Sequence, residues 1–295
     1  MNILVSGGTG FVGTHLARIL EDHEVYILSR DEWASEVQMA RETRPMYLTT
    51  EGAIKCVEFL EDMDAIVPLA AKLGHVECLK DPIGSLQAAP LITLTVLETI
   101  KHLDEKPLIV YPSSHTAYKP GTSPYSIHKV LVETYLRQYW RAWGIPSTVL
   151  RLGTMYGPGQ TRPSIINFYV KRGLAGETLP IFKGRERDRL ALTYIKDGVS
   201  ALKAAIEGRI PRTNDGPPHD AVGHCQTLLE IAEAVSELVG GTIQLDAPCS
   251  PLAEATNPGD SPVGCQLEQY IRWKPTGLRE GILKTKEWLE NGGTP

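Results

Sequence analysis

The sequence predicts an α/β protein with a doubly wound parallel sheet and a smaller, mixed lobe toward its C-terminal end. Residues 2–7 form a short apolar run typical of a buried strand, and residues 11–20 carry apolar side chains at helical spacing. Strand character returns at residues 25–28. A strand, a turn, a helix and a second strand in this order form the unit from which parallel sheets are built.

The same alternation continues through the first half of the chain and then weakens. Further strands, each after a segment that can be helical, are expected at residues 65–69, 108–111 and 147–152. Beyond Tyr156-Gly-Pro-Gly159 the regular order is lost, and helices are expected at residues 164–174, 197–207 and 227–239. We therefore expect one domain over residues 1–155 and a second over residues 156–295, some segments of which return to the first.

Composition and charge exclude several classes of protein. The 295-residue chain is 42% hydrophobic and 22% charged, and its net charge of −5 gives no overall attraction to nucleic acid or anionic membrane. Its five cysteines are scattered without Cys-x-x-Cys spacing, which argues against a disulfide framework and a zinc site. With no signal-peptide pattern and no apolar run long enough to cross a bilayer, the expected location is cytoplasmic.

A glycine-rich turn, Ser6-Gly-Gly-Thr-Gly-Phe-Val-Gly13, joins the first expected strand to the first expected helix. Its first spaced glycine permits the tight turn, the second lets the backbone approach a pyrophosphate, and the third allows close helix packing. The amide groups at the start of the helix can then bind the anion. This context predicts a Rossmann dinucleotide-binding domain, with cofactor contacts from Gly7, Gly10, Phe11, Val12 and Gly13.

The end of the next expected strand, Ile27-Leu-Ser-Arg-Asp31, bears on which dinucleotide binds. An NAD enzyme normally presents an acidic side chain here, about 20 residues beyond the central glycine, to the ribose hydroxyls. This chain has Ser29 and then Arg30. A small hydroxyl followed by arginine suits a 2′-phosphate, so the sequence favours NADP over NAD. Alternatively, Arg30 only pairs with the neighbouring Asp31.

The segment Tyr125-Ser-Ile-His-Lys129 places a phenol and an ammonium four residues apart, on one face of a helix expected to begin near Pro124. A free tyrosine has a pKa near 10, so it acts as an acid or base near neutrality only beside a positive charge. Lys129 can supply that charge and can also bond the nicotinamide ribose. Ser114 follows an expected strand, at the edge where an open parallel sheet holds its ligands.

The chain resembles the extended short-chain dehydrogenase/reductases, the NAD-dependent epimerase/dehydratase family that acts mostly on nucleotide sugars, and among them the UDP-galactose 4-epimerases. The resemblance runs nearly end to end. Besides the glycine turn and Tyr125/Lys129, it rests on the segments Leu69-Ala-Ala71, Arg151-Leu-Gly-Thr-Met-Tyr-Gly-Pro-Gly-Gln160, Thr193-Tyr-Ile-Lys-Asp197 and Trp273-Lys-Pro.

This resemblance implies a role for each catalytic residue. Tyr125 would be the general acid/base, Lys129 its partner, and Ser114 the hydroxyl that bonds the substrate oxygen while a hydride moves between nicotinamide and a sugar carbon. Further cofactor contacts are implied for Leu69, Ala70 and Ala71. Substrate contacts are implied for Ser114, His115, Thr154 and Arg189. No metal is implied, and a homodimer would form through the helix that bears Tyr125 and its neighbour.

The chain departs from the family pattern where the substrate would bind. The segment between Ser114 and Tyr125 is far shorter than usual, so a loop that normally borders the substrate is missing. His115-Thr116 replaces the acidic pair of a 4,6-dehydratase, which argues against elimination of water. The arginine that usually holds the substrate diphosphate has Leu190 at its place, with Arg189 beside it.

Three functions remain open on the sequence. The first is 4-keto reduction or 4-epimerisation of a nucleotide sugar with NAD(P). The second is reduction of a non-nucleotide carbonyl by a tailoring ketoreductase, which the short segment and displaced arginine favour. The third is a non-catalytic dinucleotide-binding protein, against which the intact Ser114, Tyr125 and Lys129 argue.

Overall fold

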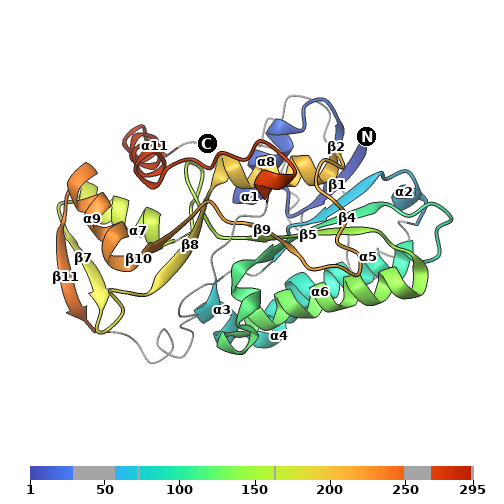
Figure 1. Ribbon diagram of the computed structural model, residues 1–295, viewed down its shortest axis with the longest axis horizontal. Helices are drawn as coiled ribbons and strands as arrows, with labels where there is room; N and C mark the ends of the chain where they lie inside the picture. Colours follow the sequence, from blue (N-terminus) through green and yellow to red (C-terminus); the bar gives the residue numbers. More distant parts are fainter. Residues whose placement is uncertain (29–56, 72–73, 163, 249–266, 294–295) are drawn as a thin grey trace.

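The computed structural model describes residues 1–28, 57–71, 74–162, 164–248 and 267–293. At its centre lies a six-stranded sheet in the order β2-β1-β3-β4-β5-β9 (Figure 1). Each pairing in it is parallel, which confirms the predicted doubly wound α/β fold. Its strands are β1 (Asn2–Ser6), β2 (Glu24–Leu28), β3 (Ala65–Pro68), β4 (Leu108–Ser114), β5 (Ser147–Leu152) and β9 (His219–Ala221).

Helices cover both faces of this sheet, which explains why its strands are apolar on both sides. Ile3 and Val5 of β1 belong to one buried cluster, while the intervening Leu4 belongs to another. On the first face lie α1 (Phe11–Ile19) and α8 (Ile195–Ile206), and on the second lie α5 (Ile92–Ile100) and α6 (Pro124–Trp143), as Figure 1 shows. The short helix α2 (Val57–Glu61) packs against α5.

Helix α6, which bears the predicted Tyr/Lys pair, has well-defined ends. Ser123 caps its N-terminus in a reciprocal capping box with Ser126, and Pro124 occupies the first position, where no amide donor is needed. Gly144 ends the helix in the left-handed conformation at a φ of 70°. The helix therefore begins at the residue that the sequence predicted.

A second helical run lies beside α6. It passes from α3 (His75–Lys80) through α4 (Pro82–Leu86) and a π-helical turn (Gln87–Leu91) into α5. By length and composition, residues 82–100 could cross a membrane, whereas the sequence predicted no such segment. Within the fold, 33% of this apolar stretch is buried. The run packs against α6. Core helices of soluble proteins can have the same length and apolar composition, so these two properties do not assign a membrane segment to the chain.

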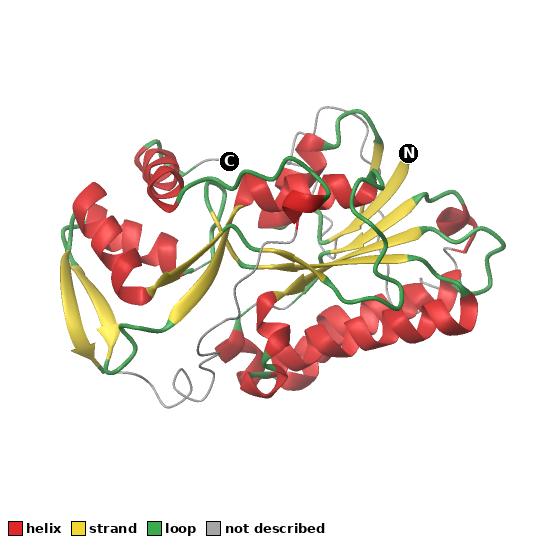
Figure 2. Cartoon of the chain, viewed as in Figure 1, coloured by secondary structure: helices red, strands yellow, loops and turns green. Residues whose placement is uncertain are grey.

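The C-terminal part of the chain forms two smaller sheets, seen apart from the large sheet in Figure 2. One has the order β10-β8-β6 and the other pairs β11 with β7. The strands are β6 (Thr154–Tyr156), β7 (Thr178–Phe182), β8 (Arg189–Tyr194), β10 (His224–Thr227) and β11 (Thr242–Ala247), and the helices are α7 (Ile165–Leu174), α9 (Leu228–Leu238) and α11 (Leu278–Glu290). The domain boundary near residue 155 stays a prediction, with α8 and β9 as the returning segments.

Candidate active site

The glycine turn between β1 and α1 has no room for side chains. Gly7 adopts a φ of 72°, and a Cβ atom there would lie 2.8 Å from the backbone nitrogen of Ala70. A Cβ atom on Gly13 would lie 2.5 Å from the carbonyl oxygen of Gly7. The Gly10 amide donates to that same carbonyl oxygen at 3.0 Å and closes the turn. These contacts explain why the turn needs glycine at the predicted spacing.

The start of α1 fits the phosphates of a dinucleotide. Gly10 is its N-cap residue and, having no side chain, leaves the first amides of the helix without a side-chain partner. Such amides, together with the helix dipole, bind an anion. Phe11 and Val12 pack against the core next to this opening, and the Phe11 ring contacts His15 edge-on. The residues present therefore fit the phosphates of a dinucleotide, NAD or NADP alike.

The end of β3 is tied to the glycine turn. The Leu69 amide donates to the carbonyl oxygen of Ser6 at 3.0 Å, and the Ala70 amide donates to the Ser6 hydroxyl at 3.4 Å. Leu69, Ala70 and Ala71 thus lie at the same sheet edge as the predicted phosphate site, as expected for cofactor contacts. Ser29 and Arg30, on which the preference for NADP rests, fall outside the described residues.

The three predicted catalytic residues come together at the carboxyl end of β4. The Ser114 hydroxyl lies close enough to the Tyr125 phenol to lower the pKa of that phenol. Lys129 lies on the same face of α6, with its Nζ atom 5.6 Å from the centre of the Tyr125 ring. That Nζ atom donates to the carbonyl oxygen of Pro112 at 2.7 Å. A phenol, a hydroxyl and an ammonium therefore share one location, as the sequence predicted.

Burial sets the protonation of this group. It raises the pKa of Tyr125 to about 12, opposed by the hydrogen bond from Ser114. Burial also lowers the pKa of Lys129 to about 8, opposed by the nearby carboxylate of Glu133. Near neutral pH the phenol keeps its proton and the ammonium keeps its charge. In this state Tyr125 is a proton donor, and a further positive charge beside it would favour the phenolate.

A buried ion pair behind the catalytic residues was not predicted. Glu133, only 6% exposed, accepts hydrogen bonds from both Nε and Nη2 of Arg151, at 3.0 and 2.6 Å. It also accepts one from the Ser113 hydroxyl at 2.5 Å. Glu133 lies one helical turn beyond Lys129 on α6. This spacing was the sequence signal that the carboxylate lies on the same face as the catalytic lysine. The pair joins α6 to β4 and β5, and so holds the helix against the strand that ends in Ser114.

The residues that follow Ser114 are buried against it. The Ser114 oxygen accepts from the amide and the hydroxyl of Thr116, at 3.3 and 3.0 Å, which leaves its own proton free for another partner. His115, predicted to bind substrate, is 4% exposed, and its Nδ1 lies 3.3 Å from the carbonyl oxygen of Leu152. Burial lowers the pKa of His115 to about 4, so the ring is neutral near pH 7.

The other two predicted substrate residues lie in the three-stranded sheet. Thr154 begins β6 and pairs with Leu192 of β8. Arg189 begins β8 on the exposed surface, where its Nη2 atom donates to the carbonyl oxygen of Cys225 at 3.1 Å. Thr154 and Arg189 therefore belong to a different sheet from Ser114.

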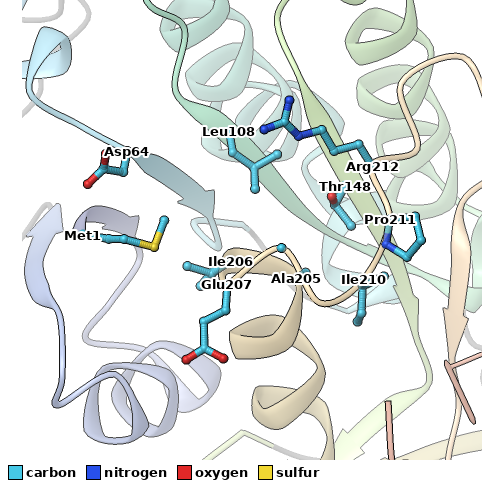
Figure 3. Close-up of a pocket in the computed structure, with 11 residues that line it drawn as sticks. Met1, Asp64, Leu108, Thr148, Ala205, Ile206, Glu207, Ile210, Pro211 and Arg212 are labelled. Atoms are coloured by element: carbon cyan, nitrogen blue, oxygen red, sulfur yellow. The ribbon is translucent and has the colours of Figure 1, made fainter. Parts of the chain in front are cut away.

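A cavity of about 400 Å³ lies at the opposite edge of the large sheet (Figure 3). Its walls include Met1, Asp64, Leu108 and Thr148, which stand at or near the amino ends of strands. The end of α8 and the residues that follow it, within the range 205–212, complete the walls. Ligands of open parallel sheets bind at the carboxyl ends of the strands. This cavity is therefore separate from the candidate active site.

Over the described ranges, His, Cys, Asp and Glu form no cluster of three or more that could hold a metal.

Known proteins with similar sequences act on nucleotide sugars. UDP-glucuronate 4-epimerase 2 of Arabidopsis thaliana is 27% identical over 73% of this chain and 56% of its own length, so the chain spans about half of that relative. UDP-glucuronic acid decarboxylase 5 of the same plant is 26% identical over 97% of this chain and 89% of its own length.

Solved structures share the whole fold. UDP-glucose 4-epimerase of Thermus thermophilus, in complex with NAD, superimposes with a TM-score of 0.81 at 21% identity, over 98% of this chain and 99% of that one. UDP-glucuronic acid 4-epimerase of Bacillus cereus, in complex with UDP-glucuronic acid and NAD, gives 0.79 at 22% identity, over 99% of each chain. The model of the NAD dependent epimerase/dehydratase family matches residues 3–214. The chain therefore belongs to the NAD dependent epimerase/dehydratase family.

Proposed function

We propose that this chain is an NAD(P)-dependent enzyme that transfers a hydride at a carbonyl or hydroxyl carbon of a nucleotide sugar, as a 4-epimerase or a 4-keto reductase. The observation that carries the proposal is the meeting of Ser114, Tyr125 and Lys129 at the sheet edge that also holds the glycine turn. Membership of the family and the nucleotide-sugar relatives support it.

The chain's own side chains would manage the proton. Tyr125 would donate its phenol proton to a substrate carbonyl oxygen during reduction and take it back during oxidation, while Ser114 hydrogen-bonds the same oxygen. The Lys129 ammonium would stabilise the phenolate between these events. A bound nicotinamide ring would supply the carbon that accepts or returns the hydride, and its oxidised form a positive charge. Gly7, Gly10 and Gly13 would hold the phosphates.

The identity of the dinucleotide is a separate part of the proposal. Ser29 and Arg30 favour NADP, whereas solved relatives were obtained in complex with NAD. Mass spectrometry of the nucleotide released on denaturation distinguishes them. Stoichiometric NAD would overturn the argument from Arg30 and indicate an epimerase that retains its cofactor. NADP, or little bound nucleotide, would support a reductase that exchanges NADPH.

The substrate is tested with a panel of UDP-, GDP- and dTDP-sugars and their 4-keto forms, with products identified by mass spectrometry and NMR. We expect at least one nucleotide sugar to be converted, with protection of the protein by the matching nucleotide in thermal unfolding. Turnover of simple carbonyl compounds, with no protection by any of the nucleotides, would favour a tailoring ketoreductase. The two short 3₁₀ turns, His115–Tyr118 and Pro120–Thr122, that span the shortened segment are the observation in favour of that second function.

A homodimer is the remaining element of the proposal. Large apolar side chains are exposed on α4, the π-helical turn and α6, namely Ile83, Leu86, Leu91, Ile127 and Tyr135. Exposed apolar side chains that gather on neighbouring elements mark protein interfaces, and these elements pack against one another. A second copy of the chain that packs through these helices would cover them. Light scattering after size exclusion should report twice the chain mass, and Ile83→Glu should shift the protein toward the monomer.

A further inference from the structure

His75 makes two contacts that connect the edge of the large sheet with the start of α6. It is the first residue of α3, and its Nδ1 atom lies 2.6 Å from the hydroxyl oxygen of Ser123. Its ring packs edge-on against the Tyr125 ring, with 5.4 Å between the ring centres and an interplanar angle of 74°. Neither contact is local in the chain, so no sequence pattern marks this histidine.

The hydrogen-bond pattern around Ser123 allows its hydroxyl to donate to His75 in the first contact. The Ser123 oxygen accepts from the Ser126 amide at 3.2 Å, as a helix cap should. The Ser126 hydroxyl proton goes to a backbone carbonyl, either that of Ser123 at 2.8 Å or that of Pro120 at 3.0 Å. The Ser123 proton is therefore available to His75 Nδ1. A neutral His75 then carries its own proton on Nε2.

Burial favours this neutral form. It lowers the pKa of His75, opposed by the carboxylate of Glu77. The titratable groups around the site include Cys78 on α3, Tyr125 and Lys129 on α6, and His115 after β4. A charge on His75 would lower the pKa of His115 further. Among the hydrogen bonds of the described residues, His75 makes the one to Ser123 and leaves Nε2 without a protein partner.

These contacts act at the end of the short segment that joins Ser114 to Tyr125 through two 3₁₀ turns. Ser123 is the cap that fixes the first turn of α6, and Tyr125 is the second residue of that helix. We propose that His75 is a positioning residue for the proposed reaction: it holds Ser123 and the Tyr125 ring so that the phenol stays at the Ser114 hydroxyl. This inference rests on the proposed role of Tyr125 and adds a side chain that acts through it.

Three replacements separate the two contacts. His75→Asn keeps a hydrogen-bond acceptor near Ser123, His75→Phe keeps the ring against Tyr125, and His75→Ala removes both. We expect His75→Ala to lower kcat by about 10- to 100-fold, because small misplacements of a reacting group have effects of this size. KM should change by less than about twofold, since the phenol acts in the transition state rather than in binding. Each single-contact variant should recover part of kcat, while the exposed His102→Ala should match the wild type.

A second readout does not depend on turnover. The ionisation of Tyr125 is followed by ultraviolet difference absorbance at alkaline pH, each variant being compared with the same variant carrying Tyr125→Phe. Removing the His75 ring should hydrate the phenol and lower its pKa from about 12. An unchanged pKa would overturn the proposal, as would a rise in KM with kcat unchanged. If no nucleotide sugar reacts at all, the proposed function fails, and this titration alone decides the role of His75.

Discussion

The two ends of the candidate site are built differently. At the hydride end, Ser114, Tyr125 and Lys129 are set by a parallel strand, a capped helix and hydrogen bonds to the backbone and to one another. At the substrate end, Arg189 begins a strand of the small sheet on the exposed surface. The catalytic groups are thus preorganised inside the fold, while Arg189, which is predicted to bind the substrate, lies outside it on the surface.

Because the two ends are built differently, substitutions at each end should change different properties of the enzyme. Preorganised groups contribute to the barrier, because their geometry is fixed before the reaction begins. Exposed charged groups on a separate sheet contribute to affinity and to the choice of substrate. Substitutions at the hydride end should therefore lower kcat or stability, and substitutions at the substrate end should raise KM.

The largest effect is expected from Tyr125→Phe, which removes the phenol oxygen and keeps the ring. Loss of a general acid/base costs about 10²- to 10⁴-fold in rate. We expect kcat to fall by about 1,000-fold, with the thermal unfolding midpoint close to that of the wild type. Steady-state kinetics on the converted nucleotide sugar measure the fall. Activity within a few-fold of the wild type would remove Tyr125 from the mechanism.

Gly13→Ala tests the glycine turn. The added methyl group would lie 2.5 Å from the carbonyl oxygen of Gly7, so the turn must shift. We expect dinucleotide affinity, measured by calorimetry, to fall by at least about 10-fold, the cost of a strained backbone of about 1–3 kcal/mol. Gly121→Ala is the matched control, because none of the described residues has an atom within 4 Å of the position that the added Cβ would take. Equal affinities in the two variants would place the phosphates elsewhere.

The buried ion pair behind the site should matter for stability. Glu133→Ala leaves the Arg151 guanidinium buried without its carboxylate, and breaking such pairs costs about 3–5 kcal/mol. Urea unfolding of the wild type and the variant measures the difference. The exposed pair between Glu237 and Arg279 is the control, and Glu237→Ala should leave the urea midpoint unchanged. Similar effects at both glutamates would mean that burial does not distinguish the two pairs.

The parts of the candidate site that could be predicted from the sequence are those marked by helical spacing or by the end of a strand. The Tyr125/Lys129 pair and the glycine turn are local patterns, and the strand that ends in Ser114 continues three residues beyond its expected end at Tyr111. Helical spacing places Glu133 on the same face of α6 as Lys129, but it does not reveal the partner of Glu133. The contacts of Glu133 with Arg151 and of His75 with Ser123 join segments distant in the chain. The short strands β6, β8 and β10 were missed for the same reason, since each is stabilised by a partner far away in sequence.

The pH dependence follows from Lys129. Because burial lowers its pKa from 10.5 to about 8, the ammonium loses its charge as the pH rises through 8, and kcat should fall there. The unfolded chain binds more protons between pH 8 and 10.5, so this residue's contribution to stability rises with pH in that window. The unfolding free energy of the wild type relative to Lys129→Met should increase across it. A difference in unfolding free energy that does not change with pH would mean that Lys129 is hydrated and keeps its ordinary pKa.

The smallest effect is expected at the substrate end. Arg189→Ala should raise KM for the nucleotide sugar by about 10-fold and leave kcat within about twofold, because an exposed guanidinium that bonds phosphate contributes to binding alone. Arg189→Lys should restore part of the affinity by keeping the charge without the two-pronged bond. A fall in kcat with KM unchanged would instead assign Arg189 to the hydride end.

Hydride transfer itself is tested most directly in a single turnover. The protein, loaded with oxidised dinucleotide, is mixed with the converted nucleotide sugar, either unlabelled or deuterated at C4, and the absorbance of reduced nicotinamide is followed. The account predicts a transient or lasting rise in that absorbance, slower with the deuterated sugar and absent in Tyr125→Phe. Conversion of the sugar with no reduced nicotinamide at any time, and at the same rate for both isotopes, would contradict it.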